Sequence, residues 1–205
     1  MKILQGIEQN TQAWLDARKG KISGSKLKGL ITKRGTGKKI GFYELMSERL
    51  GIEEAYEDPM ERGHRLEDEA IVAFVNRTSK TVTKVGLCVS DLNENIILSP
   101  DGLIEVDGKY REAIEIKCLS SARHLEAYFT QEVPADYMEQ VLQYFVVNND
   151  LEKLHLAFYD PRITSKPFFA LEVKREGLEQ EIKQCLEYQL ATIAEIESLL
   201  TSLAF

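Results

Sequence analysis

The stretch SPDGLIEVDGKYREAIEIK (residues 99–117) has the pattern of a β-hairpin with charged residues gathered at its open end. One apolar run leads to the dipeptide Asp-Gly at 107–108, which is typical of tight hairpin turns, and a second apolar run returns from it. Side chains two apart on a strand point the same way, so Glu115 and Lys117 share one face. Asp101 begins the first strand. The stretch therefore predicts a mostly apolar hairpin with two acids and a lysine near one end.

The register of this hairpin decides whether the two acids meet. A strict two-residue turn sets Val106 opposite Lys109. Counting back then places Asp101 opposite Ile114, one residue away from the face of Glu115. A three-residue turn or a β-bulge would correct the register and set Asp101 opposite Glu115. We therefore predict an irregularity in the hairpin.

Two neighbouring carboxylates repel each other, and both stay ionised only when a cation lies between them. Magnesium is the natural candidate, because it is a hard ion that takes oxygen ligands. The metal would polarise a phosphate and lower the pKa of an attacking water, while the lysine orients that water or stabilises negative charge. The hairpin end is thus a candidate site for phosphodiester hydrolysis. An exposed cross-strand ion pair is the alternative, and the apolar neighbours of these residues weigh against it.

The composition describes an ordinary soluble chain. A hydrophobic fraction of 43% and a charged fraction of 29% are typical of globular proteins, and 205 residues fit one domain spanning 1–205. The start, MKILQGIEQN, lacks the apolar core of a signal peptide, and no run approaches membrane-spanning length. Three scattered cysteines, at 88, 118 and 185, show no metal-ligand spacing and suit a reducing compartment. We expect a cytoplasmic protein without membrane association.

Charge is distributed unevenly along the chain. The net charge is −7, yet the segment from Arg18 to Lys39 holds nine Lys or Arg residues and no acid. From Glu176 to the C-terminus there are six glutamates and one lysine. This asymmetry favours a basic face turned toward a polyanion and an acidic face turned away. A solvated helix surface is the alternative explanation for the basic run.

Hydrophobic periodicity predicts an α/β or α+β fold with helices flanking a mixed sheet. Helices are predicted at 11–31 with a break near Gly20, and at 42–50, 59–76, 136–149 and 177–203. Strands are predicted at 82–89, 96–99, 153–159 and 167–174, in addition to the hairpin. Within the helix at 59–76, Glu67 lies one turn before Ile71, beside the buried face. A carboxylate there is costly unless something pairs with it.

The hairpin carries Pro100-Asp101, thirteen residues, and then Glu115-Ile116-Lys117, a spacing that resembles the PD-(D/E)xK nuclease motif. From about Gln12 to Arg175 the chain also resembles the phage lambda-type exonucleases, the YqaJ-like viral recombinase family. The matching stretches, in order, are AWLDARKGKISGS (13–25), RGHRLEDEA (62–70), SPDGL (99–103) with IEIKC (114–118), YMEQVLQY (137–144) and FYDPR (158–162). Five matches in order are far more specific than any one of them.

The resemblance implies a PD-(D/E)xK nuclease core and a metal-dependent 5′→3′ exonuclease that acts on linear double-stranded DNA in homologous recombination. Asp101 and Glu115 would hold magnesium together with the Ile116 carbonyl, and Lys117 would act on the water. Two magnesium ions are implied, with manganese as a substitute. Glu67 matches a helix glutamate near the metals. Gln140 matches a glutamine beside the active site, although a buried glutamine satisfied by backbone is an alternative.

The same family has a small pocket for the 5′-phosphate of the DNA end. Residues matching its positions are Arg18, Ser25, Ser99 and Arg123. A guanidinium grips a phosphate with two donors, and hydroxyls complete the oxygen shell. Taken singly, these residues also fit a surface charge, a helix cap and a strand-end hydroxyl. The chain departs from the family's Thr-Ala-Ser step with Ser-Gly-Ser at 23–25, and Leu119 replaces a proline that some relatives carry.

The resemblance further implies a homotrimeric ring around DNA, a single-strand annealing protein as partner, and a phage or prophage origin in a bacterial host. Two alternatives keep part of this interpretation. One is an endonuclease or repair nuclease with the same core, and the other is a non-catalytic protein that binds DNA ends in recombination. Retention of Asp101, Glu115 and Lys117 weighs against the second.

Overall fold

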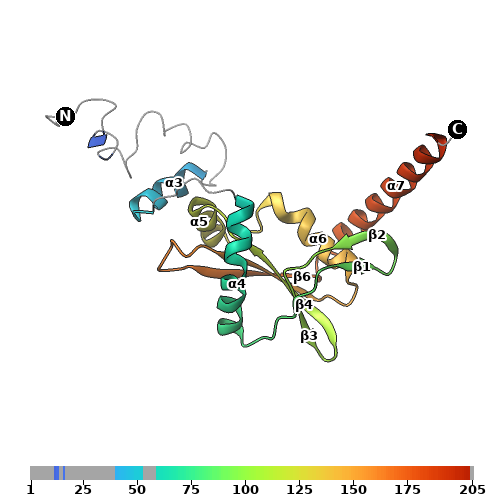
Figure 1. Ribbon diagram of the computed structural model, residues 1–205, viewed down its shortest axis with the longest axis horizontal. Helices are drawn as coiled ribbons and strands as arrows, with labels where there is room; N and C mark the ends of the chain where they lie inside the picture. Colours follow the sequence, from blue (N-terminus) through green and yellow to red (C-terminus); the bar gives the residue numbers. More distant parts are fainter. Residues whose placement is uncertain (1–11, 14–15, 17–39, 53–58, 204–205) are drawn as a thin grey trace.

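A four-stranded mixed sheet forms the centre of the fold (Figure 1). The computed structural model describes residues 12, 13, 16, 40–52 and 59–203. Across the sheet the strands are β3 (Gly102–Val106), β4 (Lys109–Lys117), β5 (Lys153–Tyr159) and β6 (Phe168–Lys174). The pairs β3–β4 and β5–β6 run antiparallel, and the central pair β4–β5 runs parallel. A separate two-stranded sheet joins β1 (Cys88–Ser90) to β2 (Asn93–Leu98).

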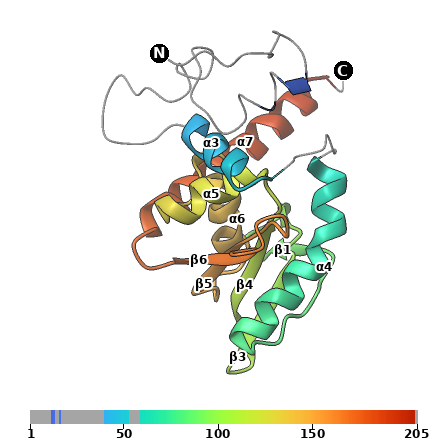
Figure 2. The same ribbon diagram turned by 90° about the vertical axis from the view of Figure 1, so that its left-hand side faces the viewer.

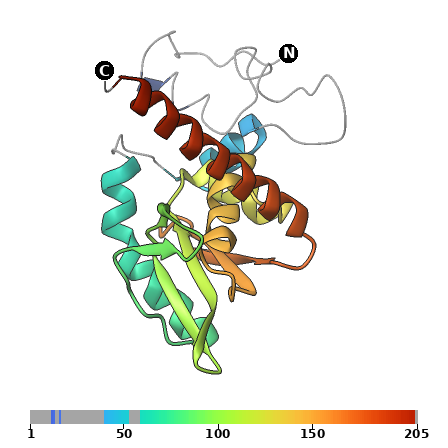
Figure 3. The same cartoon turned by 90° about the vertical axis from the view of Figure 1, so that its right-hand side faces the viewer.

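Helices cover both faces of this sheet. They are α3 (Ile40–Arg49), α4 (Pro59–Thr78), α5 (Ser121–Thr130), α6 (Met138–Val147) and α7 (Glu179–Leu203), with a short 3₁₀ turn η1 (Ala135–Tyr137) before α6. Helix α4 lies along one face (Figure 2), and α6 lies on the other face with α7 running across it (Figure 3). The structure confirms the predicted mixed sheet with flanking helices. Within the described part of the chain, no helix is both long and apolar enough to cross a bilayer.

Alternation along β4 decides which face each of its side chains meets. Ile114 and Ile116 belong to the core beneath α4, whereas Ala113 belongs to the larger core on the α6 side. Because neighbouring strand residues point to opposite faces, Glu115 and Lys117 point toward α6 with Ala113. The shared face predicted for these two residues is therefore the face that α6 covers.

The β3–β4 hairpin contains the predicted irregularity. Its turn has two residues (107–108), both at positive φ. The register then shifts within the strand pair, which is the expected signature of a β-bulge. Beyond the shift Gly102 pairs with Ile114, so the next position brings Asp101 opposite Glu115. The bulge therefore aligns the two acids that a strict hairpin would have kept apart.

Two elements differ from the predictions. Helix α5 was not predicted, although its buried residues Ser121, His124 and Leu125 follow helical spacing. The predicted strand at 82–89 is wrong for most of its length: Thr83 makes an isolated bridge to Leu103, and a regular strand begins only at Cys88. The helix predicted at 11–31 lies almost wholly outside the described residues.

Gly102 allows the segment before β1 to approach β3 closely. A Cβ atom at this position would lie 2.2 Å from Val82 Cγ1 and 3.0 Å from Ile114 Cγ2. We expect Gly102→Ala to lower the free energy of unfolding by about 1–3 kcal/mol, because Val82 must move. Urea unfolding would measure this change. Gly63→Ala is the control, since a Cβ there meets nothing within 4 Å; equal stability of the two variants would contradict the close approach.

Candidate active site

Glu115 is the centre of a hydrogen-bonded cluster at the open end of the hairpin. Its side chain is only 5% exposed. Lys117 Nζ donates to Glu115 Oε1 at 2.7 Å, and Gln140 Nε2 donates to the same oxygen at 2.6 Å. The Tyr144 hydroxyl donates to Glu115 Oε2. Three donors thus stabilise a carboxylate that burial alone would disfavour.

Lys117 is fixed in place by contacts other than Glu115. Its Nζ also donates to Gln140 Oε1 at 2.7 Å and lies 4.6 Å from the centroid of the Tyr137 ring. An ammonium above an aromatic face is attracted by the negative charge of the ring's π surface. The ammonium of Lys117 is therefore held beside the carboxylates, where it can orient a water or stabilise a negative oxygen.

Helix α6 supplies both Gln140 and Tyr144. The two residues are one helical turn apart, so they share the face of α6 that meets the sheet. Burial, followed by the negative charge of Glu115, raises the pKa of Tyr144 well above its usual range, so its hydroxyl stays protonated and donates. Gln140 was predicted from its sequence context, whereas Tyr144 was not. The signal for it was a tyrosine four residues after the glutamine in a helix almost free of charge.

Asp101 is partly buried beside Glu115, and both features raise its pKa. Its Oδ2 accepts a hydrogen bond from the Ile116 N–H at 2.7 Å. Burial, and then the charge of Glu115, raise the pKa of Asp101 to about 7, against smaller opposing effects of the Ile116 hydrogen bond and Lys117. Lys117 therefore lowers the pKa of Asp101 by less than burial and Glu115 raise it.

The oxygen atoms around Asp101 suit a hard cation. Pairing with β3 ends at Ile114, and the N–H of Ile116 points out of that edge toward Asp101. The carbonyl of a strand residue points to the same side as its N–H, so the Ile116 carbonyl faces the same edge. Carboxylate and carbonyl oxygens are the donors that Mg²⁺ prefers. Asp101, Glu115 and this carbonyl therefore offer oxygen atoms of the kind that Mg²⁺ binds, and the described residues include no cluster of three or more His, Cys, Asp or Glu side chains arranged around one metal position.

Glu67 lies apart from this pair. It belongs to α4, which covers the sheet face opposite to the one that Glu115 and Lys117 share. Its side chain is 27% exposed, and its Oε1 lies 3.1 Å from Lys84 Nζ. The charge of Glu67 contributes to the raised pKa of Asp101, so the two acids are close enough to interact. Glu67 is thus close enough to Asp101 to affect its pKa, and the ammonium of Lys84 lies in front of it.

The residues predicted to bind a 5′-phosphate are only partly described. Arg18 and Ser25 lie outside the described residues. Ser99 is exposed, two residues before Asp101. Arg123 lies on α5 and forms an ion pair with Glu126 at 2.9 Å. Its surroundings form a groove of about 370 Å³ that also holds Glu132 and Asp136, so in this structure Arg123 faces acids.

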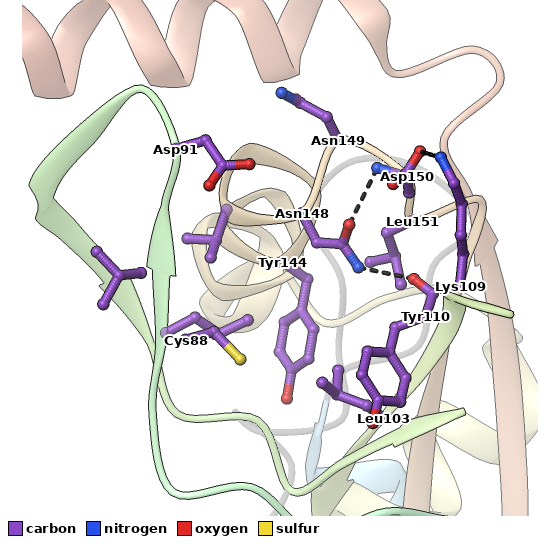
Figure 4. Close-up of a pocket in the computed structure, with 13 residues that line it drawn as sticks. Cys88, Asp91, Leu103, Lys109, Tyr110, Tyr144, Asn148, Asn149, Asp150 and Leu151 are labelled. Atoms are coloured by element: carbon purple, nitrogen blue, oxygen red, sulfur yellow. Dashed lines mark hydrogen bonds and ion pairs between the residues drawn. The ribbon is translucent and has the colours of Figure 1, made fainter. Parts of the chain in front are cut away.

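A cavity of about 420 Å³ lies between α6, the β1–β2 hairpin and the β3–β4 hairpin (Figure 4). The ring of Tyr144 forms part of its wall, while the hydroxyl of the same residue reaches Glu115. Lys109, the one cation among the lining residues, is paired with Asp150 at 2.9 Å. None of the catalytic, metal-binding or phosphate-binding residues predicted from the sequence is among the described residues that line this cavity. These lining residues offer no unpaired cation for a phosphate.

A buried ion-pair network anchors the chain directly after β4. The Asp160 side chain is fully buried and accepts hydrogen bonds from Arg62 Nη2 at 2.9 Å and Arg162 Nε at 2.8 Å. Arg62 Nη1 donates to the Cys118 carbonyl at 2.8 Å. Burial alone would raise the pKa of Asp160, but hydrogen bonds from Arg162 and from Ser121 lower it. The network therefore ties α4 to the segment that follows the lysine of the site.

The mixed sheet, with Asp101 before one strand and Glu115 and Lys117 on the next, is that of the PD-(D/E)xK nucleases. Two crystal structures of LHK-Exo, an alkaline exonuclease from Laribacter hongkongensis, share this fold; one of them holds dAMP. Each superposes with a TM-score of 0.62 and 29% identity, covering 95% of this chain and 98% of LHK-Exo.

The family model described as the YqaJ-like viral recombinase domain matches residues 13–150. Because this match covers well over half of the chain, the chain belongs to that family. No curated protein sequence gives a significant match. Family and structural neighbours together support a nuclease role for the chain, and they confirm the resemblance inferred from the five sequence stretches.

Proposed function

We propose that the protein is a magnesium-dependent exonuclease that digests linear double-stranded DNA in the 5′→3′ direction from 5′-phosphorylated ends. The product would be 3′ single-stranded DNA for recombination by strand annealing. The observation that carries this proposal is the meeting of Asp101, Glu115 and Lys117 at the open end of one bulged hairpin. The raised pKa of Asp101 supports a cation at this place.

The proposed roles follow from the contacts of each residue. Asp101, Glu115 and the Ile116 carbonyl would hold the first magnesium ion, and Glu67 would serve a second. When bound, magnesium polarises the phosphate and lowers the pKa of the attacking water. Lys117 orients that water and stabilises the negative charge that develops on the phosphate. Gln140 holds the side chains of Lys117 and Glu115 in their relative positions by hydrogen-bonding to both.

Further parts of the proposal concern the DNA end and the assembly. Arg18, Ser25, Ser99 and Arg123 would bind the 5′-phosphate, and Arg123 must leave Glu126 to do so. We also propose a homotrimer, with manganese able to replace magnesium and with a single-strand annealing protein as partner. Its place of action would be the cytoplasm of a bacterial host, with the gene carried by a phage or prophage.

The end requirement is tested with linear and covalently closed forms of the same plasmid. We expect degradation of the linear form in magnesium, none in EDTA, and an intact closed circle. Cutting of the closed circle would show an endonuclease instead. Binding to DNA ends without any degradation would support a non-catalytic role.

The raised pKa of Asp101 predicts that the effect of magnesium on the melting temperature depends on pH. The folded protein holds the Asp101 proton up to about pH 7, whereas the unfolded chain loses it near the ordinary value of 3.8. Stability therefore falls as pH rises between these values, relative to Asp101→Asn. We expect magnesium to raise the melting temperature at pH 8 and to have little effect at pH 5. A shift of equal size in Asp101→Asn would contradict metal binding at this residue.

A further inference from the structure

Lys84 lies in front of Glu67, although it belongs to no helix or strand. Its Nζ is 3.1 Å from Glu67 Oε1 and 2.6 Å from Asp68 Oδ1. Asp68 is 84% exposed, so its contact with Lys84 is open to water, and the hydrogen bonds from Lys84 to Asp68 and then to Glu67 raise the pKa of Lys84. Glu67 is more enclosed, at 27% exposed, and its charge reaches Asp101. Lys84 therefore places an ammonium against the carboxylate of Glu67.

The backbone holds Lys84 at this place. Thr83 exchanges two hydrogen bonds with Leu103, at 2.8 and 2.9 Å. The preceding residue, Val82, packs so closely on Gly102 that a Cβ there would overlap it. The backbone at Lys84 is thus held beside the start of β3, which follows Asp101 directly in the chain. Its ammonium is accessible from solvent, because 52% of the side chain is exposed.

An ammonium and a divalent cation compete for one carboxylate, because the two positive charges repel each other. A phosphate is an alternative partner for the ammonium, since charge-assisted hydrogen bonds to phosphate oxygens are strong. Resting on the proposed function, we propose that Lys84 exchanges Glu67 for a backbone phosphate of bound DNA and thereby releases Glu67 to a divalent cation.

This exchange couples two binding events. DNA binding would strengthen metal binding at Glu67, and by reciprocity metal binding would strengthen DNA binding. Replacing the ammonium with a side chain of similar length should therefore have opposite effects on the two ligands. Free protein should bind the metal more tightly, whereas DNA should lose one phosphate contact.

The test compares the full-length wild type with Lys84→Met. Calorimetric titration with Mn²⁺ alone, without DNA, should show about tenfold tighter binding by the variant. This change is similar in size, but opposite in sign, to the affinity that is usually lost when a group beside a metal ligand is replaced. Binding of a 5′-phosphorylated duplex in EDTA, where hydrolysis does not proceed, should weaken. The slope of log K against log salt should fall in magnitude by about 1, as for loss of one phosphate contact.

Lys109→Met is the matched control, because Lys109 is also 52% exposed and ion-paired but lies at the other end of β4. It should leave both measurements unchanged. In a Glu67→Gln background, Lys84→Met should no longer tighten Mn²⁺ binding. If Lys84→Met leaves Mn²⁺ affinity or the salt slope at the wild-type value, the inference is wrong. These readouts need no hydrolysis, so absence of degradation by the wild type would refute the proposed function separately.

Discussion

Lys117→Ala is expected to lower the rate of DNA hydrolysis by about 10³-fold, which corresponds to about 4 kcal/mol in the barrier. The ammonium is the group placed to stabilise charge on the reacting phosphate, and its contacts with Gln140 and the Tyr137 ring hold it there. The fold should persist, because Glu115 keeps hydrogen bonds from Gln140 and Tyr144. Initial rates on linear duplex DNA at saturating magnesium would measure the loss.

Lys109→Ala is the control for this substitution. Lys109 lies on the same strand, at the turn end, and its ion pair with Asp150 is exposed. We expect hydrolysis at the wild-type rate. A Lys117→Ala variant that folds and retains more than about a tenth of the wild-type rate would show that Lys117 has no catalytic role.

The second large effect concerns stability. Asp160→Asn is expected to lower the free energy of unfolding by about 3–5 kcal/mol, the usual cost of breaking a buried ion pair from one side. The substitution keeps the shape but removes the negative charge that faces Arg62 and Arg162. Urea unfolding followed by circular dichroism would measure the change.

Asp150→Asn is the matched control, since Asp150 is an exposed aspartate with a single lysine partner. Its variant should unfold at nearly the wild-type urea concentration. Equal midpoints for Asp160→Asn and the wild type would mean that the network does not support the fold.

Local rules were sufficient for the centre of the site. Alternation placed Glu115 and Lys117 on one face, and the mismatch between a two-residue turn and two facing acids required a bulge. Both expectations concern residues close in sequence, where strand period and turn length leave few choices. The structure confirms both.

Contacts between distant segments could not be predicted in the same way. Lys84 reaches Glu67 from a segment whose Val82 packs closely on Gly102, and no local pattern indicates this contact. The strand predicted at 82–89 was wrong for most of its length, because this segment meets the sheet through one isolated bridge in place of regular pairing. Helix α5 had two local signals, apolar residues at helical spacing (Ala122 and Leu125) and a cap in which Ser120 accepts from the Arg123 N–H.

The most direct test of the central claim is digestion of a linear duplex that carries a radiolabel at either the 5′ or the 3′ end of one strand. With magnesium and a 5′-phosphate, we expect mononucleotides to be released early from the 5′-labelled strand and late from the 3′-labelled strand. Removal of magnesium, or of the Lys117 side chain, should abolish the release. Early release from the 3′ label, or equal release in EDTA, would contradict a metal-dependent 5′→3′ exonuclease built on Asp101, Glu115 and Lys117.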